Sequence, residues 1–251
     1  MLRILALLPL LLGSPAVGAI ELVTGTDYAP YAADSALAGG MATEIVATVF
    51  ADLGDPARIT YAGWQRGLQK VLEGEFAGTF PYTPLPEREA VFLYSAPLVT
   101  TRNVVFSRTA APVRFEGPAD LRGLRLCLPA GYAAPKPLLP MIESGAILRV
   151  PANDLPVCAR MVADGRADFF AIDELVGRRA AQQAGLPDGT LSAGGTPLLI
   201  NTLHLIVPRA DILADSRIAA FNAGLERLKA SGRYDGIVAR HREQFLASAA
   251  P

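Results

Sequence analysis

The amino-acid sequence predicts an α/β protein built as two lobes, each with a central sheet flanked by helices. Short apolar runs alternate along the chain with segments whose apolar residues recur at helical spacing. The chain also repeats one plan: Gln69–Thr83 and Arg160–Glu174 both pass from a helix end, through a glycine and a charged residue, into an apolar strand followed by polar groups. Such alternation favours an α/β sheet in each half of the protein.

The first part of the chain alternates strands and helices and ends each helix with a turn signal. Asp55 with Pro56 stops the first helix, and Gly74 ends the second. In chain order we expect the strand Ile20–Thr26, the helix Met41–Leu53, the strand Arg58–Tyr61, the helix Trp64–Leu72 and the strand Ala77–Phe80.

The remainder continues the alternation and closes with two helices. In order we expect strands at Val91–Tyr94, Val104–Ser107, Leu124–Leu128 and Ile147–Val150, the helix Pro156–Asp164, the strand Ala167–Ile172, the helix Leu175–Ala184, the strand Leu203–Val207, and helices at Ile212–Ser231 and Tyr234–Phe245. Crossovers at Thr100–Asn103 and Asn201–Leu203 divide the chain into lobe 1, residues 20–102 plus 203–251, and lobe 2, residues 103–202.

The segment Gly74–Pro97 gathers polar groups just past the carboxyl end of a strand. Its apolar strand breaks at Pro81, and a proline-rich turn brings Thr83 and then Arg88 before the next apolar run. In open α/β sheets, small ligands bind at this edge. The guanidinium of Arg88 offers a planar fork that matches a carboxylate, although a surface salt bridge with Glu87 or Asp173 is the simpler alternative.

The N-terminus has the pattern of a secretory signal peptide. A basic Arg3 precedes the apolar run Ile4–Leu12 and a small-residue site, which predicts cleavage after Ala19, export to the periplasm and a mature chain of 232 residues (251 minus 19). The formal net charge of −1 gives no basic field for nucleic acid or anionic lipid. The two histidines and two cysteines show no metal-ligand spacing, so no metal or cofactor is expected.

The two cysteines, Cys127 and Cys158, form an even count in an exported protein, which favours a disulfide between them over two buried free thiols. On the chain-entropy account, closing a loop of this length stabilises the fold by roughly 3–4 kcal/mol.

In the order and spacing of several short segments, the chain resembles a family 3 extracellular solute-binding protein, the amino-acid-binding component of ABC importers. The resemblance spans nearly the whole mature chain. The segments that carry it are Tyr28–Tyr31, Trp64, Gly74–Pro97 with Arg88, Gly131, Gly165–Glu174 with Asp173, and Ser231–Asp235. It implies the two-lobed fold of type II periplasmic binding proteins, a monomer, and a membrane permease as partner.

The resemblance also implies roles for individual residues. Arg88 would bind the ligand carboxylate and Asp173 the ammonium, so that the two charges face each other across a cleft. Tyr28 and Trp64 would hold the ligand side chain, and Thr83 would contact the ligand. In the family, a serine or threonine often follows the glycine that Gly131 matches. Here Tyr132 follows instead, and we include both Gly131 and Tyr132 as ligand contacts.

These features predict a periplasmic protein that captures a small zwitterion, an amino acid or related carboxylate, by closing its lobes for ABC-type import. Two other functions remain open from the sequence. One is a periplasmic lyase of the cyclohexadienyl dehydratase type, in which Asp173 or Glu174 would act as general acid. The other is a binding protein that informs a membrane sensor.

Overall fold

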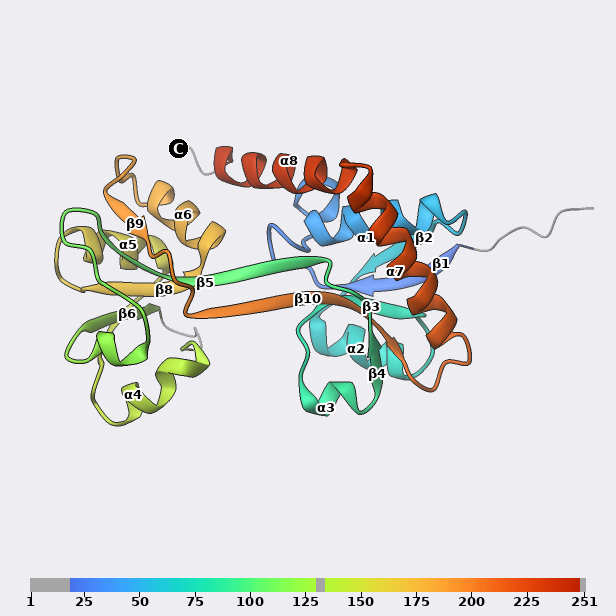
Figure 1. Ribbon diagram of the computed structural model, residues 1–251, viewed down its shortest axis with the longest axis horizontal. Coiled ribbons are helices and arrows are strands. Elements are labelled where there is room, and N and C mark those ends of the chain that lie inside the picture. Colours follow the sequence, from blue (N-terminus) through green and yellow to red (C-terminus); the bar gives the residue numbers. More distant parts are fainter. Residues whose placement is uncertain (1–18, 130–133, 249–251) are drawn as a thin grey trace, which may run out of the picture.

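Two lobes lie side by side in the structure, a computed structural model that describes residues 19–129 and 134–248. Two long strands, β5 (Val99–Arg108) and β10 (Leu199–Pro208), run between the lobes and join them (Figure 1). The predicted fold class, two α/β lobes connected by two crossover strands, is confirmed. Among the described residues, no helix is both long enough and apolar enough to cross a membrane.

Lobe 1, on the right in Figure 1, contains the N-terminal end of the described chain, and its last helix, α8 (Arg233–Ala247), extends from it toward α6 (Glu174–Gln183) of lobe 2. Its strands are β1 (Ile20–Thr24), β2 (Ala57–Tyr61), β3 (Gly78–Tyr82) and β4 (Phe92–Tyr94). Its helices are η1 (Leu37–Gly39), α1 (Met41–Asp52), α2 (Trp64–Leu72), α3 (Pro86–Glu89), α7 (Ala214–Ala230) and α8 (Arg233–Ala247).

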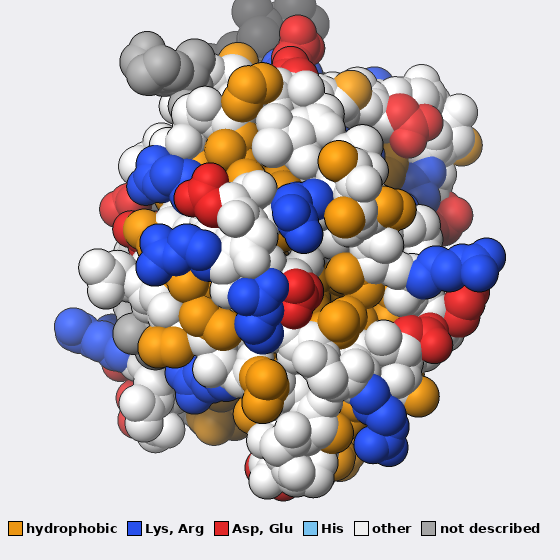
Figure 2. Space-filling view, turned by 90° about the vertical axis from the view of Figure 1, so that its left-hand side faces the viewer, with side chains coloured by type: hydrophobic (Ala, Val, Ile, Leu, Met, Phe, Trp, Pro, Cys, Tyr) orange, Lys and Arg blue, Asp and Glu red, His pale blue; other side chains and the backbone are white. Residues whose placement is uncertain are grey.

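Lobe 2 is formed by the middle of the chain. Its strands are β6 (Arg125–Pro129), β7 (Leu148–Ala152), β8 (Phe169–Asp173) and β9 (Leu191–Ala193). Its helices are η2 (Pro118–Leu121), η3 (Lys136–Leu138), α4 (Leu139–Glu143), α5 (Leu155–Ala163) and α6 (Glu174–Gln183). Figure 2 views the end of the molecule formed by this lobe, where basic, acidic and apolar side chains are interspersed.

The crossover strands change partners partway along their length. The residues Val99–Asn103 of β5 pair with β10, and from Asn103 onward β5 pairs with β8. On β10, pairing with β5 ends at Leu203, and the remaining residues pair with β3 and β4. Both crossovers expected from the sequence are therefore the interior of continuous strands, and the lobe boundaries at 102/103 and 202/203, which stay a prediction, fall within them.

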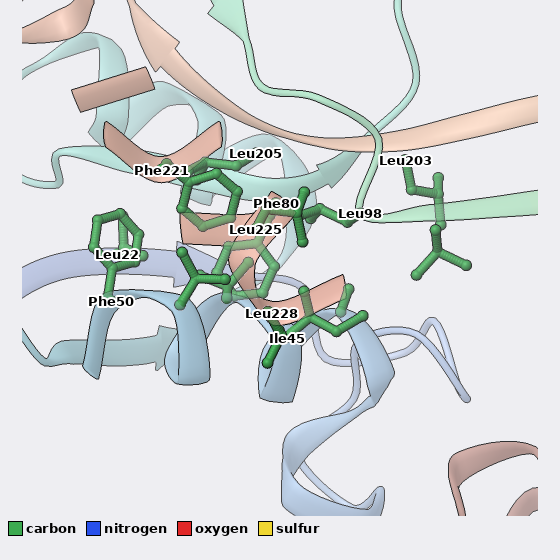
Figure 3. Close-up of a cluster of buried hydrophobic side chains, with 14 of the residues drawn as sticks. Leu22, Ile45, Phe50, Phe80, Leu98, Leu203, Leu205, Phe221, Leu225 and Leu228 are labelled. Atoms are coloured by element: carbon green, nitrogen blue, oxygen red, sulfur yellow. The ribbon is translucent and has the colours of Figure 1, made fainter. Parts of the chain in front are cut away.

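The core of lobe 1 lies between its sheet and the helices α1 and α7. Figure 3 shows side chains from β1, β3 and β10 meeting those of the two helices. The rings of Phe50 and Phe221 lie 5.3 Å apart and both residues are almost fully buried. Burying a phenylalanine side chain of this kind stabilises the fold by roughly 1.5–3 kcal/mol. Leu203, which is 1% exposed, belongs to this core and also reaches the pocket described below.

The predicted disulfide between Cys127 and Cys158 is confirmed, and it joins β6 to α5 inside the core of lobe 2. Both residues are buried. The bond therefore ties a strand and a helix that the surrounding apolar contacts already hold together.

The prediction that Pro81 breaks its strand is wrong, because β3 continues through Pro81 to Tyr82. The pairing of β3 with β10 is irregular between His204 and Ile206, and proline, which has no N–H to donate, is tolerated at such an irregularity. The turn expected after it also contains a short helix, α3, and Arg88 lies on that helix.

Candidate ligand-binding site

A pocket of about 450 Å³ lies on lobe 1 and gathers most of the predicted site residues. Four of them, Tyr28, Trp64, Thr83 and Arg88, line it. The other lining residues are Asp27, Pro81, Tyr82 and Leu203. The pocket is therefore built from the loop after β1, the start of α2, the end of β3 and helix α3, the edge where the sequence places ligand groups.

Arg88 is held beside the pocket without an acidic partner. One guanidinium nitrogen, Nη1, donates to the Thr83 carbonyl at 3.3 Å, and the guanidinium carbon lies 4.9 Å from the centre of the Tyr82 ring. Within the described chain, no Asp or Glu oxygen lies within 4.0 Å of Arg88. The salt bridge considered as its alternative role is absent from these residues, and the charge-assisted hydrogen-bonding capacity of the fork faces the pocket unneutralised.

Three aromatic rings form the wall of the pocket. The Trp64 ring meets Tyr28 with centroids 6.3 Å apart and Tyr82 with centroids 5.7 Å apart, both edge-to-face. Such contacts are worth about 0.5–1.5 kcal/mol each beyond the area they bury, so the rings hold one another in place. Trp64 also donates its indole Nε1–H to Asp27 Oδ1 at 2.7 Å.

Gly25 is the residue that allows the indole of Trp64 to lie where it does. A Cβ atom placed on Gly25 would lie only 2.0 Å from the indole Cζ2. The absence of a side chain at this position, directly after β1, therefore leaves the space that the indole ring occupies.

Asp173 lies at the start of α6 in lobe 2, and it does not line the pocket. Its Oδ1 accepts hydrogen bonds from the backbone N–H groups of Leu175 at 3.1 Å and Val176 at 3.2 Å, so it is the N-cap of the helix. Its Oδ2 accepts from the Tyr31 hydroxyl of lobe 1 at 3.1 Å. The sequence alternative, helix capping, is present, together with a contact between the lobes that the sequence did not predict.

Electrostatics couple this buried acid to the aromatic wall. Burial raises the pKa of the Asp173 carboxyl, against the opposing effect of its hydrogen bonds. Burial and the nearby Asp173 charge together raise the pKa of Tyr28 to about 12, and the same causes raise the pKa of Tyr31 further. Both tyrosines therefore keep their hydroxyl protons at neutral pH, and Tyr31 donates one to Asp173.

Gly131 and Tyr132 fall outside the described residues. Glu174 pairs with Arg102 at 3.3 Å and Arg178 at 2.7 Å, which ties α6 to the crossover strand β5. His204 is buried with both ring nitrogens 2.7 Å from oxygen partners, and burial lowers its pKa.

The sequence reasoning missed two residues of the site. Asp27 lines the pocket next to Tyr28, and its position directly before an aromatic residue at a strand end was the available signal. Tyr82 supplies a ring to the wall and packs against Arg88. Nothing in the sequence distinguishes it from an ordinary core tyrosine, and in the structure it is 6% exposed.

The fold and the pocket define a two-lobed α/β binding protein of type II. The family of bacterial extracellular solute-binding proteins, family 3, matches residues 20–244, and the chain belongs to that family. The resemblance seen in the sequence is thereby confirmed. No curated protein sequence matches this chain.

Solved structures of similar fold include amino-acid transport components. The second substrate binding domain of a putative amino acid ABC transporter from Streptococcus pneumoniae shares 20% identity with a TM-score of 0.70, covering 88% of this chain and 99% of that one. Substrate binding domain 2 of GlnP from Lactococcus lactis, in an open conformation, shares 18% sequence identity with a TM-score of 0.70, covering 91% of this chain and 97% of that one. The L-cystine solute receptor of Neisseria gonorrhoeae, in its unliganded open conformation, shares 20% sequence identity with a TM-score of 0.69, covering 92% of this chain and 94% of that one.

Proposed function

We propose that this protein captures a small zwitterionic solute, an amino acid or a related carboxylate, and delivers it to the permease of an ABC importer. The observation that carries the proposal is Arg88, whose guanidinium has no acidic partner among the described residues and lies at the edge of a pocket walled by three aromatic rings. A carboxylate is the group that such a fork binds best, and ring faces suit the body of a small organic ligand. Membership of the solute-binding family supports it.

Closure of the lobes supplies the mechanism. The pocket lies on lobe 1, so a ligand bound there gains further contacts only when lobe 2 covers it. The strands β5 and β10 are the connections about which the lobes would move. A ligand that contacts both lobes shifts the population toward the closed form by its differential affinity for the two forms. Burying the ligand charges costs desolvation unless each is paired, which is why a fixed arginine is needed.

The proposal includes the cellular setting predicted from the sequence. The chain would be exported, cleaved after Ala19 and act as a monomer in the periplasm. The closed form would be the one that docks on the permease. A protein that instead serves a membrane sensor would use the same pocket and closure, and a histidine kinase gene beside its own would favour that role.

A ligand screen tests the proposal and separates binding from catalysis. The purified mature protein is heated with each of the twenty protein amino acids and L-cystine, and compounds that raise the unfolding temperature are titrated by calorimetry. We expect saturable binding of at least one compound, which mass spectrometry recovers unchanged after long incubation. Chemical conversion of the bound compound would instead support the lyase alternative, and no binding across the set would contradict the proposal.

A further inference from the structure

One hydrogen bond joins the two lobes at the residue that the family resemblance assigns to the ligand ammonium. The hydroxyl of Tyr31, which lies between β1 and α1 of lobe 1, donates to Asp173 Oδ2 at 3.1 Å. Tyr31 is 2% exposed and Asp173 is 9% exposed, so both partners are largely shielded from water. The lobes therefore share a buried polar contact at a residue of the candidate site.

The hydrogen bonds of Asp173 leave its carboxylate one open acceptor position. An ionised carboxylate has about four such positions, roughly two on each oxygen. Oδ1 accepts the backbone N–H groups of Leu175 and Val176, which occupy both of its positions. Among the described residues, Oδ2 accepts only the Tyr31 hydroxyl. A ligand ammonium can therefore bind at Oδ2, beside the Tyr31 hydroxyl and without displacing it.

The Tyr31 ring connects this oxygen to the pocket. Its centroid lies 5.1 Å from that of Tyr28, and Tyr28 lines the pocket and meets Trp64 edge-to-face. Burial raises the pKa of Tyr28 to about 12, and the charge of the nearby Asp173 contributes to that rise. The acid of lobe 2 is thus held at the border of the aromatic wall of lobe 1, although it is not itself a lining residue.

The Tyr31 hydroxyl favours the form of the carboxylate that binds a cation. Burial disfavours an ionised carboxylate, and each hydrogen bond that Asp173 accepts offsets this cost. The hydroxyl also fixes Oδ2, which the two N–H groups on Oδ1 do not contact. A phenylalanine at position 31 would keep the ring but leave Oδ2 without a donor from the described chain.

We propose that Tyr31 is a positioning residue for ligand recognition: its hydroxyl holds the Asp173 carboxylate so that the open position on Oδ2 receives the α-ammonium of the solute. The inference rests on the proposed function and on the ammonium role that the resemblance implies for Asp173. Because the two residues belong to different lobes, the bond keeps the acid of lobe 2 next to the pocket of lobe 1. The solute then meets an oriented partner, which lowers the ordering cost of binding.

The variant Tyr31→Phe removes only the hydroxyl, and Tyr234→Phe is its matched control. The Tyr234 hydroxyl donates to the Leu98 carbonyl at 2.8 Å, away from Asp173. Both variants are titrated by calorimetry with the tightest binder among the twenty protein amino acids and L-cystine. We expect Tyr31→Phe to weaken binding by about tenfold, the order of one hydrogen bond to a charged group, and Tyr234→Phe to change it less than about twofold.

Unchanged or tighter binding in Tyr31→Phe would overturn the inference. In the first case the hydroxyl has no effect on the carboxylate, and in the second it competes with the ammonium for Oδ2.

A second compound separates positioning from a purely structural role. It is the same amino acid with hydrogen in place of its α-ammonium. Its binding is followed by the fluorescence of Trp64, the single tryptophan of the chain, which lines the pocket and allows titration to high ligand concentration. We expect wild type and Tyr31→Phe to bind it equally, because it has no ammonium for Asp173 to receive. Equal losses for both compounds would show that the hydroxyl only maintains the fold, and the inference would be wrong.

The variant Asp173→Asn distinguishes this inference from the proposed function. Asparagine can still cap α6, so the helix start is retained. Asp173→Asn should weaken binding of the amino acid, and adding Tyr31→Phe to it should change the affinity less than about twofold, because Tyr31 acts through the carboxylate. Full affinity in Asp173→Asn would overturn the inference while the proposed function, carried by Arg88, stands. Failure of wild type to bind any compound of the set would overturn both.

Discussion

Replacing Gly25 by alanine should displace the Trp64 indole from the pocket wall without replacing any residue that lines the pocket. The added Cβ would lie 2.0, 2.1 and 2.5 Å from three carbons of the Trp64 indole. Ordinary van der Waals contact begins at 3.4 Å, so the ring must withdraw by 1.4 Å (3.4 minus 2.0) at its closest atom. A displacement of this size is sufficient to disrupt the 2.7 Å hydrogen bond from Trp64 to Asp27.

The expected cost is that of losing a tryptophan from a binding site, about 2 kcal/mol or roughly 30-fold in affinity for the best-binding amino acid. Trp64 is the single tryptophan of the chain, so its fluorescence reports the change directly, and the emission should shift to the red as the indole moves into water. The matched control is Gly63→Ala, next to Trp64, where an added Cβ meets nothing within 4 Å. Wild-type affinity and emission in Gly25→Ala would refute this account of how the wall is built.

Three further results are expected. Arg88→Lys keeps the charge but loses the planar fork, so affinity for carboxylate ligands should fall about tenfold by calorimetry, and equal affinity would remove Arg88 from the site. Replacing Cys127 and Cys158 together by alanine should lower the free energy of unfolding by about 3–4 kcal/mol in denaturant titrations, for a closed loop with a sequence separation of 31; an unchanged midpoint would contradict this. Asp168 is hydrogen-bonded to Arg125, which lowers the pKa of its carboxyl, so its stabilisation is present above the unfolded pKa of about 3.9 and is lost as pH falls through the lower folded pKa. Asp168→Asn should therefore unfold more easily than wild type at pH 7, with the difference shrinking toward pH 2; a difference independent of pH would count against the ion pair.

Local patterns predicted most elements of the fold. The helix Trp64–Leu72 is found at the predicted residues because an apolar face and a following glycine define both of its ends within the sequence. The long strands β5 and β10 were predicted too short, at Val104–Ser107 and Leu203–Val207. Their additional residues mix polar and apolar, buried and exposed side chains: Thr101 is buried, whereas Ile200 is 56% exposed. Those residues are extended because the two strands pair with each other, a tertiary contact that no local pattern encodes.

The site likewise contains residues that the sequence predicted and a contact that it did not. Thr83 and Arg88 were predicted at one sheet edge from the local pattern, and Tyr28 and Trp64 as ligand contacts from the family resemblance. All four line one pocket, because the carboxyl ends of neighbouring parallel strands meet there. The engagement of Asp173 by Tyr31 was out of reach, since the two residues lie 142 positions apart in the sequence and on different lobes.

A crystal structure of the protein with its tightest-binding amino acid tests the central claim most directly. The account predicts the ligand carboxylate within hydrogen-bonding distance of the Arg88 guanidinium and the ligand body against the Trp64 ring. A ligand bound with its carboxylate away from Arg88, or in a cavity that excludes this pocket, would contradict it.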